Sequence, residues 1–199
     1  DLFYNSPNTI GNPNLEPEEA FAQEIGVKYN LGKFTTSVAV FNRNATNLID
    51  FVRESTTDSK FTANNIAKVN TQGFEINTAY NFKMNTFNQT LSFGYNFLED
   101  DILEQNKDLS RYSLNTLKHQ FITRFSSRLF KNVRQNIIYK HAERTIGTSY
   151  NVWDASINVD FNKFNFTVTA NNIFNADYIE SGFVPMPPSN VLFGLRYNF

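Results

Sequence analysis

The chain has 199 residues, 41% of them hydrophobic, and a formal net charge of -1, which allows one ordinary domain and offers no basic surface for nucleic acid. Its mean hydropathy is -0.41, and no apolar run reaches the roughly 18 residues that a transmembrane helix needs, so such a helix is excluded. Membrane-spanning β-strands remain allowed, because each needs only about 9 to 11 residues and every second residue faces away from lipid. The absence of cysteine excludes disulfides and thiolate metal ligands.

Aromatic and amide residues are abundant, with 21 Phe, 9 Tyr and 29 Asn. Together they suit strands that have one apolar and one polar face, and Asn also favours tight turns. The first residues form a polar, Pro-containing stretch without the features of a signal peptide. We therefore expect a fragment of a longer protein whose N-terminal part precedes Asp1.

Apolar and polar residues alternate with a period of two along most of the chain, which predicts β-strands. Nine strands are expected, at residues 18–31, 33–46, 69–82, 88–98, 117–130, 133–144, 150–161, 164–174 and 189–199. In the eighth, for example, Val168 lies between Thr167 and Thr169. Because a strand turns successive side chains to opposite faces, each of these segments has one apolar and one polar face.

The connections between these strands alternate in length. Short connections at residues 31–33, 83–87, 131–132 and 162–163 alternate with longer ones at 47–68, 99–116, 145–149 and 175–188. Outer-membrane barrels have short periplasmic turns and longer outer loops, so the alternation predicts an antiparallel up-and-down transmembrane β-barrel with a periplasmic C-terminus. Residues 1–17 then end an outer loop. Since bacterial single-chain barrels close with an even number of strands, nine strands predict an incomplete wall.

A soluble antiparallel sandwich is the main alternative fold, because its strands also alternate. The expected strand lengths of about 11 to 14 residues exceed the usual 5 or 6 of globular sheets, which favours the barrel. Large aromatic residues also gather beside the short connections, as expected at a membrane interface. They are Tyr29, Phe34, Phe82, Phe130, Phe161, Phe164 and Phe199.

Charged and polar residues occupy the opposite face in mid-strand, which a wide barrel lumen tolerates. The clearest are Lys118, Gln120, Arg124, Ser126, Arg128, Arg134, Asn136 and Lys140. Such a lining suits either packing against a polar plug or the steering of an anionic metal chelate. We prefer plug packing, because charged groups in a lumen need partners simply to be satisfied.

Three segments carry a family resemblance. Residues 11–18 contain Asn12, Pro13, Leu15, Pro17 and Glu18, which match the Asn-Pro-x-Leu-x-Pro-Glu signature of TonB-dependent outer-membrane receptors. Gly73 and Glu75 resemble the Gly-x-Glu strand of that family. The segment from residue 171 to Phe199 resembles its final hairpin with a terminal aromatic residue, and residues 182–188 resemble a loop of its cobalamin and siderophore receptors.

The resemblance implies that residues 1–199 form the C-terminal portion of a barrel of about 22 strands, whose N-terminal plug and earlier strands are absent. It also implies TonB-energised uptake of a scarce ligand, such as an iron-siderophore, haem or cobalamin. The implied partners are outer-membrane lipid, the receptor's own plug domain, TonB through the missing N-terminal region and a small metal chelate. Leu195, Tyr197 and Phe199 resemble the signal read by the barrel-assembly machinery. The alternative function is a passive porin, which has neither plug nor TonB-engaging segment.

No enzyme activity, cofactor or metal site is expected. His119 and His141 fall on the face that carries Phe121 and Tyr139, so we expect them at the rim or outer surface rather than in a catalytic site. Glu99, Asp100, Asp101 and Glu104 offer oxygen atoms for calcium, but their spacing fits no known loop motif, and a solvated outer loop is the preferred interpretation.

Overall fold

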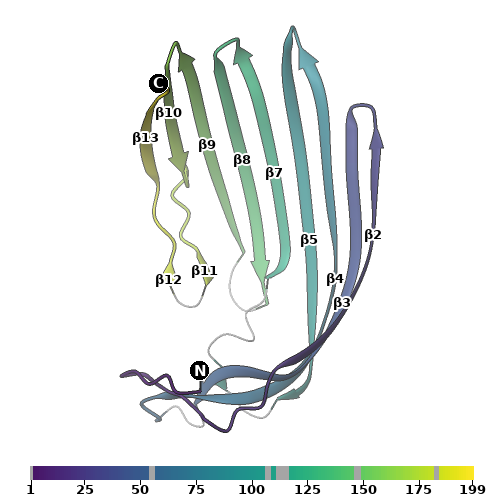
Figure 1. Ribbon diagram of the computed structural model, residues 1–199, viewed down its shortest axis with the longest axis vertical. Coiled ribbons are helices and arrows are strands. Elements are labelled where there is room, and N and C mark those ends of the chain that lie inside the picture. The colour runs from purple at the N-terminus through teal and green to yellow at the C-terminus, as the bar shows by residue number, and fades with distance from the viewer. Residues whose placement is uncertain (1, 54–56, 106–108, 111–116, 146–148, 182–183) are drawn as a thin grey trace.

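The computed structural model describes the chain except for residues 1, 54–56, 106–108, 111–116, 146–148 and 182–183. In the described part, long strands lie side by side in chain order and form one antiparallel sheet (Figure 1). They are β2 (Glu19–Leu31), β3 (Phe34–Arg53), β4 (Phe61–Met84), β5 (Phe87–Gln105), β7 (Leu117–Phe130), β8 (Val133–Arg144), β9 (Tyr150–Phe161), β10 (Phe164–Asn171) and β13 (Asn190–Tyr197). The predicted all-β architecture is confirmed.

Four short strands complete this part of the fold. The strand β1 (Thr9–Ile10) pairs in parallel with β4, and β6 (Leu109–Ser110) pairs with β3. The strands β11 (Ile179–Ser181) and β12 (Val184–Pro185) pair with each other between β10 and β13. No helix in the described ranges has the length and apolar character needed to cross a membrane.

The short connections are confirmed, and they lie at the same end of the sheet as the C-terminus (Figure 1). Three of them contain a residue with positive φ, namely Gly32 at 56°, Asn85 at 56° and Asn162 at 53°. Gly and Asn are the residues that enter this left-handed region most easily, so the sequence favours tight turns at these points. The bounds of β7, β8 and β9 coincide with those expected from the alternation.

The prediction of two long loops is wrong over much of their length, because strands continue into them. Residues 47–68 were expected to be a loop, yet β3 and β4 stay paired out to Val52 and Thr62. Residues 99–116 were expected to be another, yet β5 continues to Gln105 opposite Ala67. These outer parts mix apolar and polar residues without a period of two, as in residues 48–53 of β3, so the strands continue by backbone pairing where the apolar alternation has already ended. At the other edge β10 stops at Asn171, before the expected residue 174, because Asn172 turns the chain with a φ of 49°.

The sheet has one apolar and one polar face. On the apolar face large hydrophobic side chains remain uncovered, for example Ile25 at 71%, Phe193 at 81% and Leu195 at 66% exposure. No second described layer packs against this face, and the only separate sheet among the described residues is the β11–β12 pair, whose residues contact the polar face. A soluble sandwich would bury these side chains, so this arrangement excludes it.

Aromatic rings form two belts on the apolar face. The turn-side belt lies near the short connections and includes Phe34, Tyr80, Phe82, Phe164, Tyr197 and Phe199, with ring centroids 4.5 to 5.4 Å apart in contacting pairs. The loop-side belt includes Phe74, Phe97, His119, Phe121, Tyr139, Trp153 and Phe174, whose contacting pairs lie 4.7 to 6.3 Å apart. The sequence analysis identified only the turn-side aromatic residues.

The distance between the belts fits a bilayer. In the stretch Phe87–Phe97 of β5, the apolar face carries Phe87, Leu91, Phe93, Tyr95 and Phe97, with Gln89 at the level of Phe82. At a rise of about 3.4 Å per residue and a tilt of about 40°, this stretch spans about 25 Å along the membrane normal, the height of the apolar band in outer-membrane barrels. The parts of β3, β4 and β5 beyond the loop-side belt therefore extend past the apolar band.

Candidate functional site

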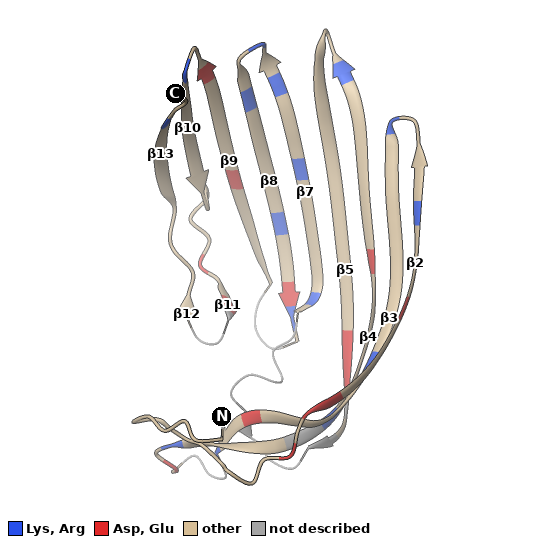
Figure 2. Cartoon of the chain, in the orientation of Figure 1, with Lys and Arg blue, Asp and Glu red and all other residues tan. Residues whose placement is uncertain are grey.

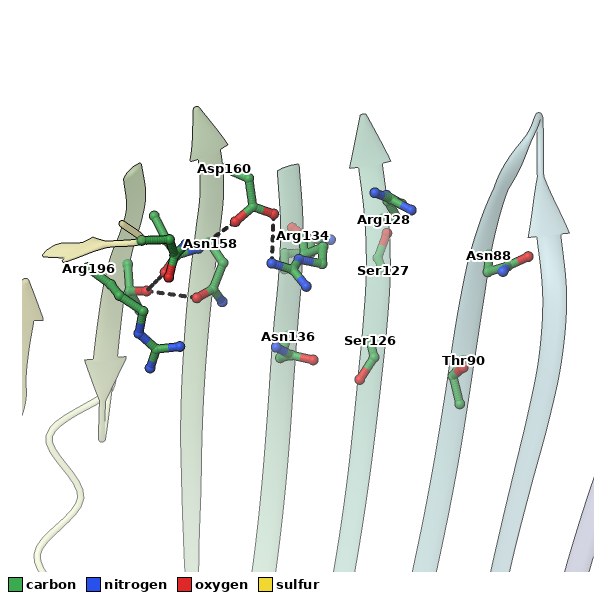
Figure 3. A pocket seen from close by; sticks show the side chains of 14 residues that line it. Asn88, Thr90, Ser126, Ser127, Arg128, Arg134, Asn136, Asn158, Asp160 and Arg196 are labelled. Atoms are coloured by element: carbon green, nitrogen blue, oxygen red, sulfur yellow. Dashed lines mark hydrogen bonds and ion pairs between the residues drawn. The ribbon is translucent and has the colours of Figure 1, made fainter. Parts of the chain in front are cut away.

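The polar face has a hollow near the short connections, with a volume of about 520 Å³. Side chains from six strands line it (Figure 3), and they include Arg128, Arg134, Asp160 and Arg196. Three guanidinium groups and one carboxylate give this hollow an excess of positive charge. Lys and Arg are also frequent on β7 and β8, whereas Asp and Glu gather on the outer part of β5 (Figure 2).

Hydrogen bonds across neighbouring strands hold the side chains of this hollow. The Arg134 guanidinium lies 2.7 Å from a carboxylate oxygen of Asp160, and the side chains are 53% and 44% exposed. Asn165 donates to the other oxygen of Asp160 at 2.7 Å. Arg128 lies opposite Arg134 in the register and donates through Nε to the Lys131 carbonyl at 3.1 Å. Each of these two like charges thus has its own acceptor, which offsets their repulsion.

A second cluster lies on the polar face at the loop ends of β8 and β9. Lys140 donates a hydrogen bond to Oε1 of Glu180, which belongs to β11. The Tyr150 hydroxyl donates to the same oxygen at 3.2 Å, and the Arg144 guanidinium donates to the Glu180 carbonyl. Tyr178 packs against Tyr150, with tilted rings whose centroids lie 4.7 Å apart. The segment between β10 and β13 is therefore folded onto the wall.

The electrostatics of this cluster follow from its partners. Burial acts to raise the pKa of the Glu180 carboxyl, but the hydrogen bond and charge of Lys140, with smaller effects of Tyr150 and Arg144, outweigh it and hold the pKa below its usual value. Burial raises the pKa of the Tyr178 hydroxyl above its usual value, and the Glu180 and Asp154 carboxylates act in the same direction. Glu180 is thus a carboxylate at neutral pH.

The base of the same segment is fixed by Asn172, a residue that is only 3% exposed. Its backbone amide donates to Asp154 at 2.8 Å. Its side chain accepts from the Ala176 amide at 2.8 Å and donates to the carbonyls of Ala176 and Pro187 at 2.9 and 3.3 Å. Asn172 therefore joins both ends of the segment to the wall independently of Glu180.

The predicted motif at residues 12–18 lies along the outer ends of β3 and β4. Asn12 donates to Asn64 at 3.2 Å and accepts from the Asn14 amide at 2.9 Å, an Asx turn around Pro13. Leu15 is half-buried, whereas Pro17 is exposed. Glu18 accepts a hydrogen bond from the Ile49 amide at 2.7 Å.

This last contact supports an irregular point of β3. The register of β3 and β4 shifts between Ala45 and Leu48, where Asn47 has a φ of 55°. Asn47 donates to the carboxylate of Glu16 at 3.0 Å. The bulge leaves backbone groups outside the regular ladder, and the motif provides partners for them.

The second predicted motif, Gly73 and Glu75, lies on the polar face of β4. A Cβ atom at Gly73 would lie 2.3 Å from the Phe97 carbonyl oxygen and 2.7 Å from the ring of Phe41. Only glycine fits, because the Phe41 ring occupies the space where a side chain would stand. Glu75 pairs with Ala39 and Asn96 in the ladders and is exposed on the same face.

The predicted C-terminal residues lie on the apolar face. Leu195 pairs with Phe166, and Tyr197 pairs with Phe164, so both follow the apolar side of β10. The rings of Tyr197 and Phe199 contact each other with centroids 5.1 Å apart. The C-terminal aromatic residues thus belong to the turn-side belt.

Both histidines lie on the apolar face, as expected. His119 is 2.8 Å from the Tyr95 hydroxyl, and His141 is 2.9 Å from the Asn151 side-chain oxygen. The acidic cluster lies on β5 rather than in a loop, where Asp100 accepts from Thr71 at 2.6 Å and Glu99 accepts from Gln72 at 3.2 Å. The described residues contain no group of three His, Asp or Glu side chains suited to a metal ion.

The start of β7 is irregular beside the predicted lining residue Lys118. The register of β7 and β8 shifts between Leu117 and His119, so Lys118 lies at an irregularity of the ladder. Leu117 takes the position opposite Arg144 and packs against the buried residues Ala142, Tyr150 and Val152. A β-bulge changes which face a residue takes, and the alternation of the sequence does not reveal it.

The model of a family described as "TonB dependent receptor-like, beta-barrel" matches residues 1–176. Solved structures with a similar fold include the FrpB iron transporter from Neisseria meningitidis, with a TM-score of 0.71, 16% identity and coverage of 96% of this chain and 33% of that one. The ferric-catecholate import receptor Fiu from E. coli K12 has a TM-score of 0.66, 19% identity and coverage of 98% and 30%.

The copper transporter OprC has a TM-score of 0.67, 14% identity and coverage of 94% and 32%. The chain thus spans about a third of the length of the solved structures that it matches. At these identities the likeness concerns the fold. No curated protein sequence gives a significant match.

Proposed function

Because the chain belongs to the family of TonB-dependent receptor β-barrels, we propose that it is the C-terminal part of an outer-membrane receptor for TonB-energised uptake of a scarce metal chelate. The family comprises receptors and transporters rather than enzymes. The observation that carries the proposal is the two-faced sheet, with an apolar band of about 25 Å between two aromatic belts and a polar, positively charged inner face. The apolar face meets lipid, and the polar face lines the lumen.

The domain proposal follows from the sheet edges. The strands β2 and β13 are the two edges of the described sheet. Within lipid an unpaired edge leaves backbone groups without hydrogen bonds, which costs several kcal/mol per group. Residues 1–199 therefore form the last strands of a closed barrel of about 22, as the family resemblance implies.

The hollow around Arg128, Arg134 and Arg196 fits contact with a plug domain contributed by the N-terminal part of the receptor. Its amide and guanidinium groups suit a polar partner with acidic side chains. TonB would then engage the receptor N-terminal to the plug. The short connections and the C-terminus face the periplasm in this arrangement, and the outer ends of β3, β4 and β5 face the medium.

The C-terminal residues have a proposed role in assembly. Leu195, Tyr197 and Phe199 present an apolar, aromatic edge at the end of the last strand. Recognition of this edge by the barrel-assembly machinery supports its insertion into the membrane.

The ligand class follows from the positive charge of the polar face, which steers anionic chelates. Similar folds belong to transporters of iron, of ferric catecholate and of copper. We place a ferric siderophore ahead of haem or cobalamin. The passive porin remains the alternative, and the two functions differ in their dependence on energy.

The test is uptake of radioactively labelled iron chelates by cells that carry the full-length receptor, with and without TonB. The receptor function predicts saturable uptake that requires TonB and the N-terminal plug. A porin would give non-saturable uptake of the same chelates in both strains, and it would conduct ions in planar bilayers without removal of any plug. That result would contradict the proposed function.

A further inference from the structure

The Glu180 carboxylate lies in a site that offers it a cation and a hydroxyl donor. Its Oε1 accepts hydrogen bonds from the Lys140 ammonium and from the Tyr150 hydroxyl, the latter at 3.2 Å. The Lys140 nitrogen also lies 5.4 Å from the ring centroid of Tyr178 and 5.6 Å from that of Tyr150. Two aromatic rings and a hydroxyl thus surround a cation on the luminal wall.

The parts of this site come from different places in the chain. Lys140, Arg144 and Tyr150 belong to the strands β8 and β9 of the wall. Glu180 belongs to the segment between β10 and β13, which lies across the polar face. Since Asn172 fixes the base of that segment through its own hydrogen bonds, the Glu180 carboxylate can leave the site without breaking the sheet or this base.

The site also remains accessible. The Lys140 and Glu180 side chains are 21% and 33% exposed, compared with 53% and 44% for Arg134 and Asp160 on the same face. Without the carboxylate, the Lys140 ammonium would lose its counter-charge in a partly dehydrated pocket, and the Arg144 guanidinium lies on the same face of β8. Such a pocket attracts an anion more strongly than the exposed pair does.

We propose that Lys140, Arg144 and Tyr150 form an anion-binding site on the luminal wall, that Glu180 occupies it in the free receptor, and that an anionic metal chelate replaces the Glu180 carboxylate there. This inference rests on the proposed uptake function and adds the residues and the charge of the ligand that they take. The Lys140 ammonium exchanges one carboxylate oxygen for an acidic oxygen of the chelate. The Arg144 guanidinium, on the same face of β8, adds a second positive charge for the ligand.

If Glu180 and the ligand compete for the same site, two substitutions should change the ligand affinity in opposite directions. In Glu180→Gln the competing charge is lost while the cations remain, so an anionic ligand binds more tightly. In Lys140→Gln the cation that the ligand needs is lost, so the ligand binds more weakly. If the Lys140–Glu180 ion pair served only to stabilise the fold, both substitutions would change the ligand affinity in the same direction, because either one breaks the same hydrogen bond.

The experiment uses the purified full-length receptor in detergent, with calorimetric titration of an anionic ferric tris-catecholate and of a neutral ferric tris-hydroxamate. Glu180→Gln should tighten binding of the catecholate complex by roughly threefold to tenfold, and Lys140→Gln should weaken it by a similar factor. Lys140→Arg should bind like the unchanged receptor. Binding of the neutral complex should change little in all three variants.

The exposed pair on the same face provides matched controls. Arg134→Gln and Asp160→Asn make the same charge changes near the short connections, and they should leave the affinity for both complexes unchanged. Heat-modifiable migration on gels confirms that each variant is folded. If both Glu180→Gln and Lys140→Gln weakened catecholate binding, or if neither changed it, the anion site would be refuted.

A different result would contradict the proposed uptake function. If the unchanged receptor bound neither chelate and cells did not take them up, the uptake function would be contradicted. The anion site then still has its own test, in which inorganic phosphate is added and amide hydrogen exchange of residues 178–180 is measured. Phosphate should speed exchange there in the unchanged receptor and not in Lys140→Gln, and equal exchange in both would overturn the proposal.

Discussion

The two faces of the sheet differ in how their exposed side chains are satisfied. On the apolar face, Phe193 is 81% and Ile25 is 71% exposed, and these side chains have no polar group to offer water. On the polar face, Thr167 donates to Asn158 at 2.8 Å and Asn165 donates to Asp160 at 2.7 Å. The same strands thus carry an uncovered hydrophobic surface and a network of cross-strand hydrogen bonds.

This difference identifies the solvent of each face. A continuous uncovered apolar surface is rare on soluble proteins, whereas it is required where lipid is the solvent. A polar network with charged groups is costly in lipid and favourable beside water or a polar partner. The chemistry of the faces therefore determines which one points outward, although both are exposed in the isolated sheet.

The largest expected effect comes from a charge on the lipid face at mid-membrane. Val168 lies on β10 halfway between Phe164 of the turn-side belt and the level of Trp153 in the loop-side belt. Val168→Arg should lower the free energy of unfolding of the full-length receptor by about 2 to 4 kcal/mol in lipid vesicles. Thr169→Arg, at the neighbouring depth on the polar face, should cost much less. Equal losses for the two variants would contradict the assignment of the faces.

A smaller effect is expected where the polar face is tightly packed. In Gly73→Ala the new Cβ meets backbone, at 2.3 Å from the Phe97 carbonyl oxygen. Because backbone cannot move aside cheaply, we expect a loss of about 1 to 3 kcal/mol in urea unfolding. The control is Gly94→Ala on the same face, where the nearest atom is the end of the Asn77 side chain at 3.1 Å. A similar loss in both would show that the effect comes from strand glycines in general.

A still smaller effect is expected at the bulge of β3. Glu18→Ala removes the acceptor of the Ile49 amide and should cost about 1 kcal/mol, seen as faster amide hydrogen exchange at Ile49 and its neighbours. Glu19→Ala changes the next residue, which has no side-chain hydrogen bond to the described bulge, and serves as the control. Unchanged exchange in Glu18→Ala would mean that the motif does not support the bulge.

The smallest effect concerns pH. The pKa of Glu180 lies below its usual value in the folded protein, so its contribution is present above the unfolded-state pKa and is lost as the pH falls through the lowered folded-state pKa. Amide hydrogen exchange at residues 178–180, corrected for its intrinsic pH dependence, should therefore become less protected only in that acidic range. Glu180→Gln should remove this dependence, and a dependence that persisted in this variant would assign it to another group.

The sequence predicted the membrane-spanning parts well, because lipid imposes a strict alternation there. The strands β7, β8 and β9 have the expected bounds, since alternation runs through them and short turns or polar segments delimit them. Outside the lipid the alternation ends although the pairing does not, so the outer parts of β3, β4 and β5 were expected to be loops. The loop-side belt was missed, although Tyr139 and Trp153 stand at alternating positions near the strand ends.

The anion-binding cluster was not predicted from the sequence. Lys140 was expected in the lumen, but its contact with Glu180 joins residues 40 apart and depends on a loop that folds onto the wall. The available signal was an acidic residue between Tyr178 and Pro185 in a mostly apolar segment. A similar limit applies to Leu117, which lies opposite Arg144, because a bulge shifts the register by one residue and the sequence pattern does not reveal it.

The assignment of the faces is tested most directly by single cysteines along β10. The chain has no cysteine of its own, so a spin label can be attached at each position from 164 to 171 in the full-length receptor reconstituted in lipid, once any cysteines elsewhere in it are replaced. The collision rate with oxygen, which concentrates in lipid, should be high at Phe166, Val168 and Ala170 and low at Thr167 and Thr169. A water-soluble nickel complex should give no access at the first three positions. A pattern with the opposite phase, or without a period of two, would contradict the assignment of the apolar face to lipid.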